Sequence, residues 1–267
     1  MQLEIVYRTD YHYEPAVTGG VTLLRMRPRS RPGLVVHEAV TIADPGFITR
    51  SYIDAWGTFV EVAEFDRTHS DSMFEIRAKV ETTPAETTAD LSPAERYLYT
   101  HDSSRAPRAG IASLGWDLGG EGHSWISVES LLRWLPQRFV YQVGATDAKT
   151  TLDEFVTRGA GVCQDFAHAM IAMLRRWGWA ARYVSGYFFS SGAGSTRIEA
   201  EAMHAWVEAF RPGFGWIALD ATAGDYADDR YVPVGYGRDY ADVAPVRGIL
   251  NSRSMQVSNS RLEITRQ

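Results

Sequence analysis

The single cysteine of this 267-residue chain, Cys163, lies where a nucleophile could work. It follows Gly161-Val162 and opens the clearest predicted helix, in which apolar residues form one stripe. That stripe consists of Phe166, Met170, Met173, Leu174 and Trp177. Backbone N–H groups and the helix dipole at a helix start favour an anion, so the sulfur would be stabilised as a thiolate. A lone cysteine is more often a small buried hydrophobic residue, so this prediction depends on the partners that the sulfur has.

A thiolate nucleophile needs a base, and His204 is the best placed of the seven histidines. It begins a predicted strand, residues 204–210, which a turn rich in Pro and Gly joins to a second strand, residues 216–220. A hairpin centred near Pro212 would place Asp220 directly opposite His204, close enough for an imidazole–carboxylate hydrogen bond. A one-residue shift of register would break that pair, because it would turn the two side chains to opposite faces.

The other histidines lack such a pattern. His168 is nearest to Cys163, but five positions along a helix turn it about 140° away, so we interpret it as a packed or solvent-facing residue. We interpret the remaining ones as structural or surface residues, namely His12, His37, His69, His101 and His123.

Composition and motifs exclude several classes of function. A formal net charge of −6 leaves no broad basic face for a nucleic acid. The apolar runs are too short to cross a membrane, and the N-terminus lacks a secretory signal, so a cytoplasmic protein is expected. The sequence has no zinc-binding, phosphate-binding or calcium-loop spacing, so it predicts no metal and no cofactor. One cysteine also excludes an internal disulfide bond.

The chain divides into two predicted domains. Residues 1–85 contain short alternating apolar segments between Gly and Pro turns, which is typical of an antiparallel β-sandwich. Residues 86–267 mix predicted helices with strands, beginning with a helix that Ser92 would cap. The weakly alternating tail, residues 255–264, is assigned to this second domain as a last strand. The sequence therefore predicts an α+β protein.

These motifs resemble those of the transglutaminase-like superfamily. Residues 161–168 are similar to its nucleophile segment, residues 204–208 to its histidine strand and residues 215–222 to its aspartate strand. Residues 237–248 are similar to a segment typical of the bacterial branch, in which a β-rich domain precedes the catalytic core. The sequence departs from the pattern at Ala221, where relatives usually carry proline, and this should alter only the exit of the strand.

The resemblance implies a papain-like core with a triad of Cys163, His204 and Asp220. Cys163 would attack a carboxamide or peptide carbonyl, His204 would transfer protons and Asp220 would hold the imidazole. The Cys163 N–H is one candidate oxyanion donor, and Tyr141 and Gln164 are alternatives for the second. Three more residues could either line the cleft or serve packing and loop anchoring, namely Trp206, Tyr240 and Asp242.

Three functions are compatible with this reading. A cysteine peptidase or amidase, which we prefer, and a transglutaminase joining glutamine to an amine share one acyl-enzyme intermediate. They differ in whether water or an amine releases the acyl group. The third is a non-catalytic binding module, which the intact triad disfavours. The expected partner is a peptide, protein or amide substrate, and exposed sheet edges in the first domain would suit a homodimer.

Overall fold

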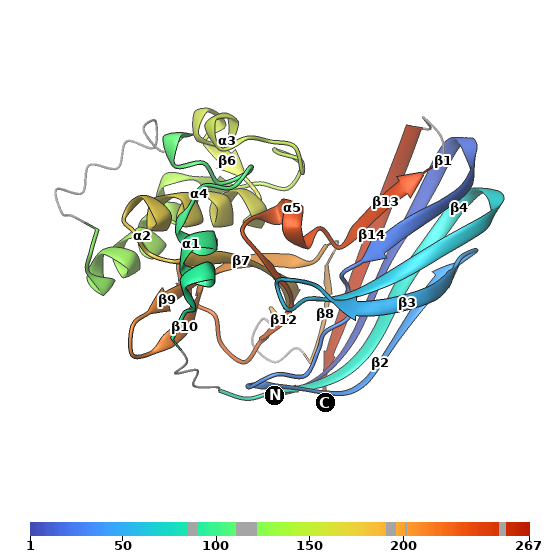
Figure 1. The fold of residues 1–267 in the computed structure, drawn as a ribbon, viewed down its shortest axis with the longest axis horizontal. Helices are drawn as coiled ribbons and strands as arrows, with labels where there is room; N and C mark the ends of the chain where they lie inside the picture. Colours follow the sequence, from blue (N-terminus) through green and yellow to red (C-terminus); the bar gives the residue numbers. More distant parts are fainter. Residues whose placement is uncertain (85–89, 111–121, 191–195, 201, 251–254) are drawn as a thin grey trace.

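The computed structural model describes residues 1–84, 90–110, 122–190, 196–200, 202–250 and 255–267. The described residues form two large antiparallel sheets, one small parallel sheet and a group of helices, with the long strands on one side and the helices on the other (Figure 1). The predicted α+β fold is therefore confirmed. No helix in the described part of the chain is long and apolar enough to cross a membrane.

The N-terminal sheet has seven strands in the order β2-β4-β1-β14-β8, with β13 paired to β1 and β3 paired to β4. The first four strands along the chain are β1 (Gln2–Leu24), β2 (Leu34–Asp44), β3 (Phe47–Ile53) and β4 (Phe59–Thr82). The other three come from late in the chain, namely β8 (Arg197–Ala200), β13 (Val246–Leu250) and β14 (Met255–Arg266). The structure has long strands here, 23 residues in β1 and 24 in β4, where the sequence predicted short ones.

The C-terminal strand lies elsewhere than expected. It was assigned to the second domain, but β14 pairs along β1 from Leu3 opposite Arg266 to Glu14 opposite Met255. The cause is its apolar alternation, because Leu262 and Ile264 are buried on the same sheet face as Leu3. The N-terminal sheet thus contains strands from both ends of the chain.

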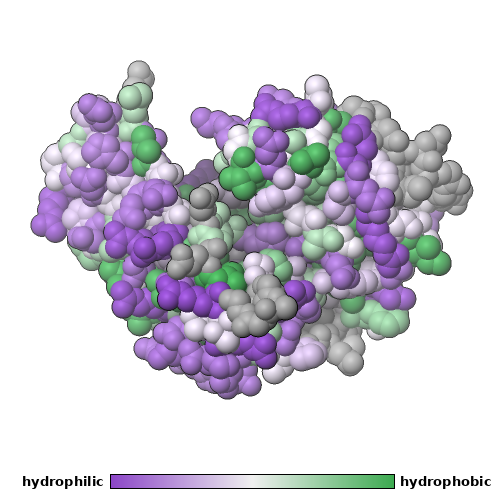
Figure 2. Space-filling model, turned by 180° about the vertical axis from the view of Figure 1, so that it is seen from behind, coloured by the Kyte–Doolittle hydropathy of each residue, from purple (hydrophilic) through white to green (hydrophobic). Residues whose placement is uncertain are grey.

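The buried face of this sheet packs on the second sheet. Its residues Ile5 and Ile76 belong to one hydrophobic cluster with Tyr187 and Val232 of the core. The sequence predicted an antiparallel β-sandwich for residues 1–85, whereas in the structure β1 to β4 lie in one antiparallel sheet and the layer that covers it comes from the second half of the chain. Seen from behind, the surface is hollowed between the two lobes (Figure 2).

The core sheet has five antiparallel strands in the order β11-β10-β9-β7-β12. These are β7 (Ala181–Phe188), β9 (His204–Arg211), β10 (Gly215–Asp220), β11 (Asp225–Tyr226) and β12 (Tyr231–Gly237). A small parallel pair, β5 (Val140–Tyr141) and β6 (Ala160–Gly161), forms a separate sheet. The helices are α1 (Pro93–Thr100), α2 (Trp125–Arg138), α3 (Leu152–Arg158), α4 (Cys163–Arg176) and α5 (Tyr240–Val243).

Helix α4 carries the cysteine and lies at the centre of the core. Every residue from Gln164 to Arg175 is buried, and the helix packs on the β9 side chains Ala205 and Val207. Near the end of the helix the guanidinium of Arg175, 1% exposed, donates to the carbonyls of Tyr99, Ala181 and Arg238 and to the Ser103 hydroxyl. These bonds tie α4 to α1, to β7 and to the loop after β12, so the helix start has a fixed position over the sheet.

Candidate active site

Cys163 is the first residue of α4 and is partly exposed. The preceding residue, Val162, makes no side-chain cap, and the Asp165 side chain instead bonds back to the start of the helix. Its carboxylate accepts the Val162 N–H at 2.8 Å and the Thr146 hydroxyl at 2.5 Å. Within the described residues, the N–H of Cys163 itself donates no hydrogen bond, so it remains available to a ligand at the sulfur.

Gly161 allows this close packing before the cysteine. A Cβ at this position would lie 2.6 Å from Asp165 Oδ2 and 2.7 Å from Phe155 Cδ2, both far too close. The carbonyl of Gly161 also accepts the N–H of Gln142, which joins the cysteine loop to the end of β5. Glycine is therefore required where the carboxylate, the phenyl ring and the loop converge.

His204 and Asp220 form the predicted hydrogen bond, with 2.8 Å between Nε2 and Oδ2. The predicted register was nevertheless wrong. In the structure Leu219 lies opposite Val207, so the next pair along the ladder is Asp220 with Trp206, and His204 is diagonal to Asp220. A displacement of two positions keeps both side chains on one face of the sheet, which is why the bond still forms.

Asp220 is 1% exposed, and both oxygens of its carboxylate accept hydrogen bonds. Oδ1 accepts the Thr222 N–H at 2.8 Å, the Thr222 hydroxyl at 2.6 Å and the Ala223 N–H at 3.3 Å. Oδ2 accepts His204 and the Tyr231 hydroxyl, each at 2.8 Å. Burial alone would raise the pKa of Asp220, but these donors and the imidazole charge together hold it well below its usual range.

His204 is held in its charged form by its two neighbours. Burial disfavours the imidazolium, but the bond to Asp220 and the interaction with the Cys163 sulfur outweigh it and raise the pKa of His204 to about 10. Because Nε2 is engaged by Asp220, Nδ1 is the ring nitrogen left for the sulfur. The side chain of His204 is only 16% exposed, so few water molecules can screen these charges.

A cavity of about 650 Å³ opens onto Cys163 and His204. Three of the other candidate residues also line it, namely Tyr141, Gln164 and Tyr240. The amide Nε2 of Gln164 is buried and has no hydrogen-bond partner among the described residues, so it offers a free donor beside the sulfur. Burial, followed by the charges of Cys163 and Asp220, raises the pKa of Tyr141, which keeps its hydroxyl a donor.

Trp206 and Asp242 do not line this cavity. The Trp206 ring, 2% exposed, lies beneath the imidazole of His204 with 6.3 Å between ring centroids. Asp242 accepts the backbone N–H and the guanidinium of Arg238, each at 2.9 Å, and so anchors the loop before α5. In the structure Trp206 therefore packs against the imidazole, and Asp242 anchors a loop.

His168 is a packed helical residue, one of the two alternatives that the sequence offered. It is 2% exposed, and its Nε2 accepts the Tyr240 N–H at 3.2 Å. Burial is the main cause that lowers the pKa of His168 to about 4, so the ring is neutral and can accept this bond. It fixes the start of α5, whose Tyr240 lines the cavity.

Sequence analysis gave no role to several residues that shape the site. Thr222 and Asp165 had local signals, since each lies two or three residues from the group that it binds or caps. Tyr231 had none, because it comes from β12 and reaches Asp220 across the core sheet. The cavity wall formed by Tyr7 and Leu262 of the N-terminal sheet was equally undetectable.

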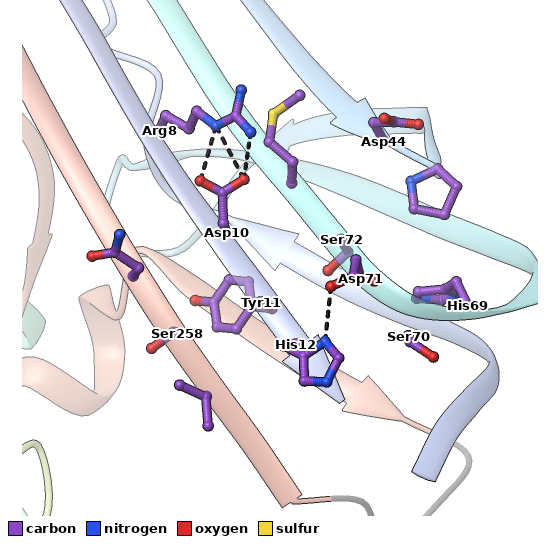
Figure 3. Close-up of a pocket in the computed structure, with 14 residues that line it drawn as sticks. Arg8, Asp10, Tyr11, His12, Asp44, His69, Ser70, Asp71, Ser72 and Ser258 are labelled. Carbon is purple, nitrogen blue, oxygen red and sulfur yellow. Dashed lines mark hydrogen bonds and ion pairs between the residues drawn. The ribbon is translucent and has the colours of Figure 1, made fainter. Parts of the chain in front are cut away.

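A second opening lies on the N-terminal sheet, among residues of β1, β4 and β14 (Figure 3). Arg8 forms an ion pair with Asp10 there, and His12 is hydrogen-bonded to Asp71. In the part of the chain that the structure describes, no group of three or more His, Cys, Asp or Glu side chains could hold a metal ion. Cys163 is not among the residues that line this opening.

Comparison with known proteins agrees with this geometry. Residues 118–221 match the model of the transglutaminase-like superfamily, and residues 3–81 match that of the bacterial transglutaminase-like N-terminal region. An uncharacterized protein of Mycobacterium tuberculosis (Rv2569c) is 32% identical over 98% of this chain and 90% of its own length. An uncharacterized protein of Mycobacterium leprae (ML0607) is 29% identical over 99% of both chains.

A solved structure shares the fold. It is a candidate cysteine protease from Cytophaga hutchinsonii, 22% identical, which matches 97% of this chain and 90% of its own with a TM-score of 0.75. At this identity the likeness concerns the fold alone. The two family models and the mycobacterial relative show that the chain belongs to the transglutaminase-like superfamily and carries the N-terminal region of the bacterial branch.

Proposed function

We propose that the protein is a cysteine hydrolase that cleaves a peptide or amide bond, with Cys163 as nucleophile. The observation that carries this proposal is the position of His204. Its imidazole interacts with the sulfur of Cys163, the only cysteine of the chain, and with the carboxylate of Asp220. Such an arrangement can hold a thiolate beside an imidazolium, and that pair is the reactive form in cysteine hydrolases.

The reaction needs only groups that the site contains. The Cys163 proton passes to Nδ1 of His204, and Sγ forms a bond to the carbonyl carbon of the amide. The C–N bond then breaks, the amine leaves with the proton from His204, and a thioester remains. Water gives a proton to His204, adds to the thioester and releases the acid, and the proton returns to the sulfur.

The oxyanion of each tetrahedral intermediate requires two donors. The Cys163 N–H is the first, because it donates to no other group in the described residues. We assign the second to Gln164 Nε2 or to the Tyr141 hydroxyl, since both groups line the cavity beside the sulfur. The Gln164 amide has the stronger structural support, because its Nε2 is buried and unpartnered among the described residues.

The first test of this function is the pH dependence of iodoacetamide labelling, read by intact mass. One cysteine gives one labelling site, so each product is assigned directly. We expect fast labelling well below pH 8 and a sharp fall in His204→Ala. His12→Ala is the matched control, because His12 also pairs with an aspartate, but in the exposed opening away from the sulfur. Labelling with the profile of a free thiol, unchanged by His204→Ala, would contradict the proposal.

The acyl acceptor is tested next with aminoacyl methylcoumarin amides. A hydrolase releases coumarin and a free carboxylic acid, and Cys163→Ala abolishes both products. If an added primary amine captured most of the acyl group in dilute aqueous solution, the protein would instead be a transglutaminase. A protein that labels fast at Cys163 but accepts no acyl substrate would favour a binding module.

A further inference from the structure

One wall of the Cys163 cavity belongs to the N-terminal sheet. Tyr7 of β1, Leu262 of β14 and Ala200 of β8 all line it. Leu262 pairs with Tyr7 on one side and with Ala200 on the other, so the three residues form a single cross-strand row. Ile198, two positions from Ala200 and on the same face of β8, lines the cavity as well.

Apart from Cys163 and His204, the described side chains that line the cavity carry no charge. None of the described residues that line it is Asp, Glu, Lys or Arg, and besides Cys163 and His204 the polar groups are hydroxyls and the Gln164 amide. The opening in Figure 3 is different, because arginine and aspartate side chains line it. Neutrality is therefore a property of the reactive cavity and not of the surface in general.

Size and chemistry together indicate what the cavity holds. A volume of about 650 Å³ is within the range of pockets that enclose a small organic ligand. A charged side chain placed against the row of Tyr7, Leu262 and Ala200 would lose its water and gain no counter-ion from these residues. An aliphatic or aromatic side chain of the substrate is stabilised there. Each methylene group that it buries raises kcat/KM by up to about fourfold.

We propose that the N-terminal sheet is the acyl-selecting element of the enzyme. The Cys163 site accepts a neutral acyl group whose aliphatic or aromatic side chain packs against the row of Ala200, Leu262 and Tyr7. This inference rests on the proposed hydrolase function and adds the substrate class to it. It also gives the N-terminal sheet a role, because the reacting groups and the selecting wall then come from different sheets.

Isosteric pairs of substrates isolate the effect of charge. The N-acetylated methylcoumarin amides of norleucine and lysine differ mainly by an ammonium group, and those of glutamine and glutamate by a carboxylate. We expect the neutral member of each pair to have a kcat/KM at least about tenfold higher, because the charged group is desolvated without a partner. This comparison needs only the unaltered protein.

Two variants at Ala200 then test the location of the selecting wall. Ala200 is half-buried and is the last residue of β8, a short strand at the edge of the sheet. A longer side chain at this position can therefore extend into the cavity. We expect Ala200→Glu to raise the lysine/norleucine ratio by at least about tenfold, and Ala200→Arg to do the same for glutamate over glutamine. Ala39→Glu is the matched control, since Ala39 is half-buried in the same sheet and does not line the cavity.

The rate of iodoacetamide labelling is measured in parallel in each protein, and Ala39→Glu, which lies outside the cavity, should label at the wild-type rate. Fast labelling with equal hydrolysis of charged and neutral members would overturn the acyl-selection proposal and leave the hydrolase proposal standing. Labelling of Cys163 at the rate of a free thiol, with no hydrolysis of any amide, would instead overturn the hydrolase proposal and this inference with it. Ratios that shift as much in Ala39→Glu as in Ala200→Glu would show that the wall lies elsewhere.

Discussion

Replacing Asp220 with asparagine should reverse the proton arrangement of the imidazole. Thr222 donates its N–H and its hydroxyl to Oδ1, so the amide oxygen of asparagine stays there and its NH₂ group faces His204. Nε2 of His204 must then accept a hydrogen bond, and the ring proton moves to Nδ1. That nitrogen can no longer take the proton of Cys163. We expect kcat to fall on the order of 10⁴-fold, the effect that a trapped wrong tautomer has in a serine triad.

The same substitution has a pH-dependent effect on stability. The pKa of His204 is raised from an ordinary value of 6.5 to about 10, which corresponds to about 5 kcal/mol shared between Asp220 and Cys163. Because the pKa of the folded state is the higher one, this stabilisation is complete below about pH 6.5 and is lost as the pH rises to about 10. The lowered pKa of Asp220 acts in a different window, since its contribution is lost only in acid.

Urea unfolding of the wild type and Asp220→Asn at pH 6, 8 and 10 measures this effect. Taking half of the total for Asp220, we expect the two proteins to differ by about 2–3 kcal/mol more at pH 6 than at pH 10. Asp71→Asn is the reference, because Asp71 pairs with His12 where both side chains are exposed. A difference between wild type and Asp220→Asn that stayed constant from pH 6 to pH 10 would refute the reasoning that Asp220 charges the imidazole.

Four further substitutions have expected outcomes. In His204→Ala, iodoacetamide labelling of Cys163 at pH 6 should fall by up to about 300-fold, because an ordinary thiol is about 0.3% thiolate at that pH. Tyr231→Phe should lower the free energy of unfolding in urea by about 1.5–3 kcal/mol, since one bond to a buried carboxylate is lost while the ring remains. Gly161→Ala should cost about 1–3 kcal/mol and slow labelling of the sulfur, because the new methyl group overlaps a carboxylate and a phenyl ring. Arg175→Met should cost at least about 3 kcal/mol in the same assay, since it removes a charged donor from four acceptors, of which the Arg238 carbonyl keeps the Ser103 hydroxyl, and a loss under 1 kcal/mol would contradict that account.

Local patterns carried enough information to find the reactive hairpin but not its register. The sequence reading centred the turn on Pro212, whereas the pairing of Gly215 with Arg211 centres it on Gly213, which has a φ of 79°. Only glycine adopts that conformation without strain, so the turn chemistry was the overlooked signal. Moving the centre by one residue displaces the opposite partner by two, which preserves the face, so His204 and Asp220 still meet.

Contacts between distant segments account for what the sequence could not predict. The helix start at Cys163 and the cap of Ser92 on α1 depend on a few neighbouring residues, and both were found. Tyr231 reaches Asp220 from another strand, and β14 finds β1 from the opposite end of the chain. An alternating tail pairs with whichever edge matches its apolar face, and a single sequence does not say which edge that is.

The division of the site between two regions has a consequence for related proteins. The segment that matches the superfamily model, residues 118–221, contains Cys163, His204 and Asp220, and therefore the groups proposed for the reaction. Tyr7 and Leu262 lie outside that segment, although both line the reactive cavity. If the N-terminal sheet selects the acyl group, a protein that shares only the core segment retains the chemistry and loses this selection. Strands at the two ends of the chain would then evolve as a substrate filter while the cysteine helix and its hairpin stay fixed.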